Sequence, residues 1–335
     1  MNAPTSTCPP HSPATHSKNH IAKTLIVGAT GQVGAQMLRF LTERDGPESV
    51  LPTARTTAIP GWLALNLAEL STPDQVASLL DPHTLNSIFC FAAMTDVEAC
   101  EDTPELAGRT NARGPGLLAA YARQRKIPFV HFSSEYVFDG ASEHPGPYTE
   151  DAPTHPLNVY GGSKLDGEHA VSDSNPDALI LRTTVVYGPD AREKNYLYSL
   201  MRNLSSATAM RVPPMRVPND QVSTPTYNLD LIFAALGLVE ARASGIFHVC
   251  GPERMSRLTF AQTIARTLGL DHTLLQGVST AQLAQRAPRP LEAGLSIAKL
   301  TTLYPHLRMR TLAEALKHTA PELGAFLQLQ ALAPR

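Results

Sequence analysis

The sequence has almost no excess of charge of either sign and no long apolar segment. Its 335 residues include 28 Lys and Arg against 30 Asp and Glu, so the formal net charge is -2. A chain so close to neutral lacks the electrostatic footprint of a protein that binds nucleic acid or an anionic membrane. No stretch is apolar for long enough to form a membrane span or the core of a signal peptide. We therefore expect its partners to be small molecules or proteins.

Cysteine is also scarce, with four residues spread along the chain at Cys8, Cys90, Cys100 and Cys250. Two of them fall in apolar, strand-like runs, where a free thiol behaves as a small hydrophobic side chain. This pattern fits a reducing compartment, and we expect a cytoplasmic protein. Nothing in the chain has the ligand spacing of a structural metal site, and we expect the Pro- and Ser-rich residues 1–20, histidines included, to be a disordered tail. No metal is predicted.

Most of the chain alternates short apolar runs with stretches of helical spacing. From residue 21 to residue 187 this alternation predicts an α/β fold with a doubly wound parallel sheet of the Rossmann type. Pro52 would be awkward in a strand that is paired on both sides, because proline cannot donate to the ladder. The expected strands are Lys23–Val27, Ser49–Ala54, Trp62–Leu65, Ser87–Phe91, Phe129–Ser133 and Leu179–Thr183.

Beyond Tyr187 the alternation lapses and prolines cluster. Short helices are expected there, notably Leu258–Leu268 and Leu312–Thr319. We expect residues 188–220 and 251–335 to form a smaller α+β lobe, with 221–250 returning to the first domain. Substrate clefts usually lie between two such lobes.

The run Gly28-Ala29-Thr30-Gly31-Gln32-Val33-Gly34 directly follows the first expected strand and opens an amphipathic stretch. Gly28 and Gly31 would let the backbone approach a pyrophosphate, and Gly34 would let helix and strand pack closely. The helix N-terminus would offer free N–H donors to the anion. The run therefore predicts a dinucleotide site, with contacts from Gly28, Thr30, Gly31, Gln32 and Val33.

The second expected strand ends without the carboxylate that commonly binds the ribose 2′-hydroxyl of NAD. Arg55 stands there instead, which favours NADP, although a solvated surface arginine is the alternative and NAD stays open. Further cofactor contacts are expected where later strands end, at Asn66, Leu67, Ala92 and Ala93. Asn111 lies inside a helix expected from Pro104 to Arg125, where asparagine needs a reason such as solvent exposure or a polar role near the cofactor.

Three side chains suggest proton transfer to a carbonyl. Tyr160 and Lys164 stand at i and i+4 of a helix expected over Tyr160–Val171, so both leave one face. A free phenol has a pKa near ~10, and a cation one turn away should lower the pKa of Tyr160 toward the working range. Ser134 would hold the carbonyl being protonated. Taken alone, a Tyr-x-x-x-Lys spacing also arises by chance on surface helices.

Together these features resemble the extended short-chain dehydrogenase/reductases, and within them the dTDP-4-dehydrorhamnose reductases. The resemblance covers Ile21 to about Leu303. Its motifs stand in the right order: GATGQVG at 28–34, AAMTDVE at 92–98, SSEYVFDG at 133–140, LNVYGGSKLDGE at 157–168, LRTTVVYG at 181–188, NDQVSTPTY at 219–227 and GIFHVCG at 245–251.

The resemblance implies that Tyr160 is the general acid, that Ser134 replaces the usual Thr as the carbonyl-binding hydroxyl, and that Lys164 also holds the nicotinamide ribose. It further implies substrate contacts from Thr95, Val97, Tyr136, Asn219, Gln221 and Thr226. Val185 stands where the reductases commonly carry a Trp, so the exact sugar is left open.

The expected function is NADPH-dependent reduction of the C4 keto group of a dTDP-4-dehydro-6-deoxyhexose, with a homodimer left open. One alternative is a regulatory protein, because several motifs and the missing Trp are also similar to the β subunit of methionine adenosyltransferase. Another is a sugar-nucleotide dehydratase or epimerase. Dehydratases resembling this family carry an Asp-Glu pair after the Thr, whereas Glu135-Tyr136 stands here and supplies one carboxylate.

Overall fold

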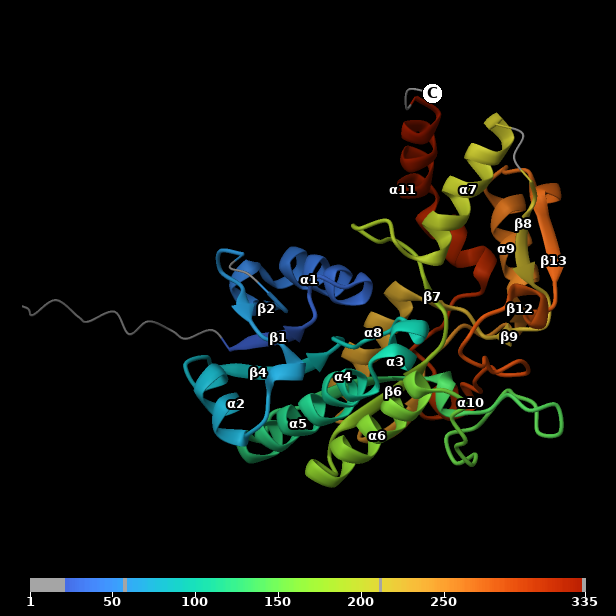
Figure 1. Ribbon diagram of the computed structural model, residues 1–335. Helices are drawn as coiled ribbons and strands as arrows, with labels where there is room; N and C mark the ends of the chain where they lie inside the picture. The colour runs from blue at the N-terminus through green and yellow to red at the C-terminus, as the bar shows by residue number, and fades with distance from the viewer. Residues whose placement is uncertain (1–21, 57–58, 211–212, 333–335) are drawn as a thin grey trace, which may run out of the picture.

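The centre of the fold is a seven-stranded parallel sheet, as the computed structural model shows for residues 22–56, 59–210 and 213–332 (Figure 1). The predicted doubly wound architecture is confirmed, while the predicted tail lies outside the described residues. Its strands, in spatial order, are β11 (Gly245–His248), β6 (Leu179–Thr183), β5 (Phe129–Ser134), β4 (Leu85–Cys90), β1 (Lys23–Val27), β2 (Val50–Ala54) and β3 (Leu63–Ala64).

Pro52 does lie in a strand with neighbours on both sides. β2 pairs with β1 from Val50 to Pro52, but with β3 only at Thr53 and Ala54. Pairing on the β3 side therefore begins after the proline. The seventh strand, β11, was not among the expected strands, and it comes from the segment that was expected to return to this domain.

Two layers of helices cover the sheet. Strand side chains alternate between the layers, with Ile26 packed on the side of α1 (Gln32–Asp45) and α8 (Asn228–Glu240), and with Leu25 and Val27 on the other side. The helices of that second layer are α2 (Pro73–Leu80), α5 (Gly114–Arg125) and α6 (Val159–Ser174) (Figure 1). Because both faces are covered, most strand residues are buried and most of them are apolar.

The helix expected from Pro104 to Arg125 is interrupted. It consists of α4 (Pro104–Gly108), a π-helical turn over Arg109–Arg113 and α5. Just before it, α3 (Val97–Asp102) is capped by the Asp96 side chain. A π-helical turn inside a helix is rare and often marks a functional site, and this one contains Asn111.

The second lobe lies beside the sheet (Figure 1). Its helices pack around Leu200, Phe260, Ile264 and Leu316. The expected helix Leu258–Leu268 is found as α9, one residue displaced, and the expected Leu312–Thr319 extends further as α11. The elements are α7 (Tyr196–Met210), β8 (Met215–Pro218), α9 (Arg257–Thr267), β13 (Leu275–Val278) and α11 (Leu312–Leu332).

Short ladders and one helix join the lobes. β7 (Val186–Tyr187) pairs with β10 (Thr226–Tyr227), and β9 (Val222–Ser223) pairs with β12 (Met255–Ser256). The helix α10 (Ala298–Leu303) buries Leu300 in the core of the first lobe, although residues 251–335 were expected to belong to the second. In the described ranges no helix is long and apolar enough to span a bilayer.

A buried ion pair fixes α6 to the sheet. Glu168 of α6 accepts two hydrogen bonds from Arg182 of β6, at 2.9 and 2.7 Å, and one from the Ser133 hydroxyl at 2.5 Å. The two charged side chains are only 3% and 4% exposed. Such a pair is costly to break from one side, because the remaining charge stays buried without its partner.

We expect Arg182→Met to lower the free energy of unfolding by roughly 3–5 kcal/mol, because it leaves the Glu168 carboxylate buried and uncompensated. Arg39→Met is a matched control, since Arg39 pairs with Glu322 at 3.3 Å on the surface and such pairs are worth about 1 kcal/mol or less. Urea titrations measure both. Equal stabilities of the two variants would contradict the role given to the buried pair.

Candidate functional site

The glycine run forms a tight turn between β1 and α1. Gly28 has φ +88°, and a Cβ there would lie 2.7 Å from the backbone nitrogen of Ala92, so only glycine fits. A Cβ at Gly34 would lie 2.4 Å from the Gly28 carbonyl oxygen. Gly31 precedes α1 and, in the part of the chain that is described, no side chain caps this helix start. The first-turn N–H groups beside this narrow turn fit a pyrophosphate.

The other predicted cofactor residues surround the carboxyl ends of the same strands. Ala92 and Ala93 follow β4, and Arg55 follows β2 with its side chain exposed. Adjacent strands β4 and β1 lead to connections in opposite directions along the sheet, which is where open α/β sheets bind ligands. The Asn66 side chain makes hydrogen bonds within its own segment: it accepts from the Ala68 N–H and donates to the Glu69 carboxylate. Leu67 is buried. The cofactor contacts of these two residues stay predictions.

Ser134, Tyr160 and Lys164 come together at the end of β5 and the start of α6. Asn158 caps α6 by accepting from the Gly161 N–H, which fixes where the helix begins. Lys164 is 2% exposed and its Nζ donates to the Phe132 carbonyl oxygen at 2.5 Å. A hydrogen bond with Ser134 acts to lower the pKa of Tyr160. The three predicted catalytic residues therefore lie in one place.

The expected fall in the pKa of Tyr160 is wrong for the protein alone. Burial of the phenol is the largest influence and raises its pKa to about 12. Burial also lowers the pKa of Lys164 to about 8, against the charge of Glu168 one turn further along α6, which raises it. The i, i+4 spacing predicts that Tyr160 and Lys164 share a helix face, but it does not report how far packing removes the phenol from water. Tyr160 therefore stays protonated at neutral pH, which is the state that a proton donor needs.

Asn111 connects the turn after β4 to the catalytic helix α6. It is fully buried, its Oδ1 accepts from Met94 N–H at 2.7 Å, and its Nδ2 donates to the Met94 carbonyl and to the Ser163 hydroxyl. The prediction that it contacts the cofactor is therefore wrong for its side chain, because every polar atom is already used within the protein. It holds the turn after β4 against α6.

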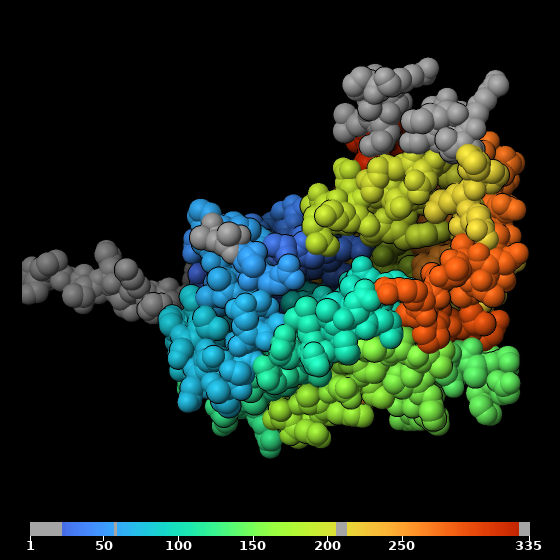
Figure 2. All heavy atoms as spheres, viewed as in Figure 1, coloured from blue at the N-terminus to red at the C-terminus, as the bar shows by residue number. Residues whose placement is uncertain are grey.

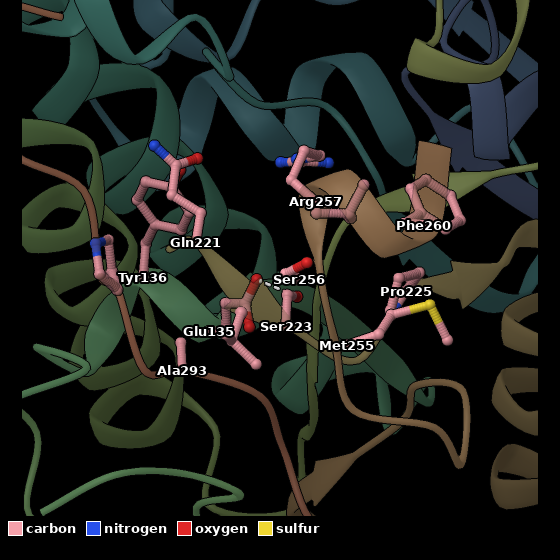
Figure 3. Close-up of a pocket in the computed structure, with 13 residues that line it drawn as sticks. Glu135, Tyr136, Gln221, Ser223, Pro225, Met255, Ser256, Arg257, Phe260 and Ala293 are labelled. Carbon is pink, nitrogen blue, oxygen red and sulfur yellow. Dashed lines mark hydrogen bonds between the residues drawn. The ribbon is translucent and has the colours of Figure 1, made fainter. Parts of the chain in front are cut away.

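A pocket lies between the two lobes beside this triad. Figure 2 shows the surface hollowed between the blue-to-teal segments of the first lobe and the yellow segments of the second. Tyr136 lines the pocket, and its ring packs edge-on against Tyr160 with centroids 5.4 Å apart. The predicted substrate residue Gln221 lines it as well, as do Ser223 and Arg257 from the second half of the chain (Figure 3). Val185 is a further lining residue.

Four predicted substrate residues do not line this pocket. Thr226 is fully buried and its hydroxyl bonds Thr183 and Thr184, so the prediction that its side chain contacts substrate is wrong. Asn219 is exposed, and its backbone N–H donates to the carbonyl of Val278, the last residue of β13. Thr95 and Val97 lie at the start of α3, outside the lining residues, and their substrate contacts stay predictions.

Glu135 is a pocket residue to which the sequence assigned no role in the site. It is 3% exposed, its Oε1 accepts from the Ser223 hydroxyl at 2.7 Å and its Oε2 from the Gly294 N–H at 3.1 Å. Burial raises its pKa to about 7. The sequence noted it only as the single carboxylate that follows Ser134, where dehydratases resembling this family carry an Asp-Glu pair. Elsewhere, the described ranges contain no group of three or more His, Cys, Asp or Glu side chains that could hold a metal ion.

Comparisons with known proteins agree with this geometry. The family model described as "RmlD substrate binding domain" matches residues 22–324. The chain is 34% identical over 275 residues to the probable low-salt glycan biosynthesis reductase Agl14 of Haloferax volcanii. This match covers 82% of this chain and 90% of that protein. It is 33% identical over 251 residues to the dTDP-4-dehydrorhamnose reductase of Burkholderia thailandensis, covering 72% and 77%.

A regulatory protein is also among the relatives. The methionine adenosyltransferase 2 subunit beta of Xenopus laevis is 31% identical over 283 residues, covering 83% of this chain and 81% of that subunit. Two solved structures are similar over 90% of this chain and 99% of theirs. They are a dTDP-4-dehydrorhamnose reductase from Clostridium acetobutylicum (30% identity, TM-score 0.78) and one from Bacillus anthracis in complex with NADP (26%, 0.76).

The buried Glu135 carboxyl should make folding stability depend on pH. Its pKa is raised from 4.5 to about 7, so the folded chain holds this proton more tightly than the unfolded chain. Its contribution to stability is complete below pH 4.5 and is lost as the pH rises to about 7, by on the order of 3 kcal/mol.

We expect urea titrations across this range to show the extra loss in the wild type and not in Glu135→Gln. Glu105→Gln, at an exposed position of α4, is the control and should follow the wild type. Parallel profiles for the wild type and Glu135→Gln would contradict the assignment.

Proposed function

The chain belongs to the RmlD substrate binding domain family, and we propose that it reduces the C4 keto group of a nucleotide-linked 4-dehydro-6-deoxy sugar with NADPH. The preferred substrate is dTDP-4-dehydrorhamnose, on which the named reductase relatives act. The observation that carries the proposal is the meeting of Ser134, Tyr160 and Lys164 at the end of β5 and the start of α6, where the Tyr160 ring packs against Tyr136 of the pocket lining.

Each of these residues has a chemical task. NADPH, when bound at the glycine turn, supplies the hydride. Ser134 holds the carbonyl oxygen by a hydrogen bond, and Tyr160 donates a proton to that oxygen as charge develops on it. Lys164, fixed by the Phe132 carbonyl one helical turn from Tyr160, would supply the positive charge that favours the phenolate left after proton transfer. Gly28, Thr30, Gly31, Gln32, Val33, Ala92 and Ala93 line the place proposed for the cofactor.

The two other readings are less well supported. A purely regulatory role like that of the methionine adenosyltransferase relative would not require a phenol, a hydroxyl and an amine gathered beside a pocket. A dehydratase needs a second acid or base, yet Glu135 is the single carboxylate among the described residues that line the pocket, and both of its oxygens already accept hydrogen bonds.

The proposal also includes the subcellular location and the oligomeric state. The described cysteines are free, buried thiols at Cys90, Cys100 and Cys250, which supports a reducing compartment such as the cytoplasm. A homodimer is compatible with the proposal, because every proposed catalytic group comes from one chain. Fractionation and analytical ultracentrifugation test these two points.

Replacing Tyr160 by Phe should lower reduction of dTDP-4-dehydrorhamnose on the order of 10²-fold or more, because the proton donor is removed while the ring is kept. NADPH affinity should stay close to that of the wild type. Loss of absorbance at the nicotinamide band measures turnover. Tyr121→Phe, on α5 and bonded to Asp81, is the control. A fully active Tyr160→Phe variant would rule out the assigned acid, and a wild type that binds NADPH without turnover would favour the regulatory reading.

Arg55 should decide the preference between cofactors. If its guanidinium binds the 2′-phosphate, Arg55→Ala should weaken NADPH binding roughly 10-fold or more and leave NADH binding nearly unchanged. Arg39→Ala removes a charge from the exposed face of α1 and should alter neither. Fluorescence titration with both nucleotides measures the ratio, and an unchanged ratio in Arg55→Ala would reject the 2′-phosphate contact.

A further inference from the structure

Arg257 is placed in the pocket by its own backbone. It is the first residue of α9, and its backbone N–H donates to the Gln221 carbonyl at 2.8 Å. This bond ties the helix start to the residue just before β9, the strand that pairs with β12. Its side chain lines the pocket together with Glu135, Tyr136 and Ser223. Figure 3 shows its guanidinium directed away from the Glu135 carboxylate.

This guanidinium is held in position yet keeps its donors free. It lies over the ring of Tyr196, 5.1 Å from the centroid. Within the described ranges it takes part in no ion pair and no side-chain hydrogen bond, whereas nearby Arg254 pairs with Glu292 at 2.5 Å and Arg289 with Glu98 at 2.9 Å. An arginine that faces a pocket with its planar fork unused is suited to an anion with several oxygens.

The charge of Arg257 also reaches the rest of the site. Burial raises the pKa of both Glu135 and Tyr136, and the positive charge of Arg257 acts against this rise in both groups, so its field acts across the pocket. Glu135 does not satisfy it, because the oxygens of that carboxyl accept from Ser223 and Gly294 instead. The pocket thus has a carboxyl near the triad and a positive charge at the start of α9.

We propose that Arg257 binds the diphosphate of the nucleotide-linked sugar, an inference that rests on the proposed function. The keto carbon must approach Ser134 and Tyr160, next to Tyr136. The diphosphate carries the substrate's negative charge and lies beyond the sugar, which brings it toward Arg257. The residue therefore anchors the substrate at a distance from the reacting carbon and selects sugars that carry a nucleoside diphosphate over free sugars.

The test compares the wild type with Arg257→Met and Arg257→Lys. Calorimetry measures the affinity for dTDP and for thymidine, which lacks phosphate. We expect Arg257→Met to weaken dTDP binding roughly 10- to 100-fold, Arg257→Lys to retain part of it, and thymidine binding to be unchanged. In turnover assays the KM should rise while kcat changes little, because the contact is made before and during reaction alike.

Arg266→Met is the matched control, since Arg266 is exposed at the last turn of the same helix. It should leave dTDP affinity unchanged, and NADPH affinity should be equal in all variants. Equal dTDP affinity in wild type and Arg257→Met, no dTDP binding by the wild type, or an equal loss of thymidine binding would each overturn the inference. Weakened dTDP binding without any reduction of the sugar would instead overturn the proposed function and leave the anion contact standing.

Discussion

The site depends on how α6 is fixed to the central sheet by polar contacts inside an apolar interface. Lys164 donates to the Phe132 carbonyl, and one turn later Glu168 binds Arg182 of β6 and the Ser133 hydroxyl. These groups are buried, so any other rotation or register of α6 would leave charges without partners in a medium of low dielectric. Because any other orientation of α6 would cost this free energy, the direction in which the Tyr160 side chain leaves the helix is fixed.

The same interface receives support from the next layer. Asn111 bonds both the turn after β4 and Ser163 of α6, and it does so from a π-helical turn that interrupts the α4–α5 helix. The turn after β4 also approaches Gly28 so closely that a Cβ would not fit. Cofactor turn, support helix and catalytic helix are therefore connected through short contacts, and a shift in one would displace the others.

The pocket is completed from elsewhere in the chain. Glu135 follows Ser134 directly, yet its carboxyl oxygens bind Ser223 and Gly294, which are distant in sequence. The second lobe contributes Arg257 through a short ladder rather than through a large shared core. Because these segments come from outside the central sheet, we expect that small differences in them can change which sugar is accepted without altering the sheet.

Much of the fold and the triad could be predicted from sequence, because parallel strands, glycine turns and an i, i+4 pair follow from local periodicity and backbone geometry. Local patterns do not show how deeply a side chain is buried. The pKa of Tyr160 rises because its phenol is buried, and the side chains of Thr226 and Asn111 make their hydrogen bonds to other residues of the protein. The sequence by itself thus determined which chemical groups are present and on which elements they stand. Only the tertiary structure decided which of them face the pocket, since burial and long-range hydrogen bonds depend on packing between segments far apart in the chain.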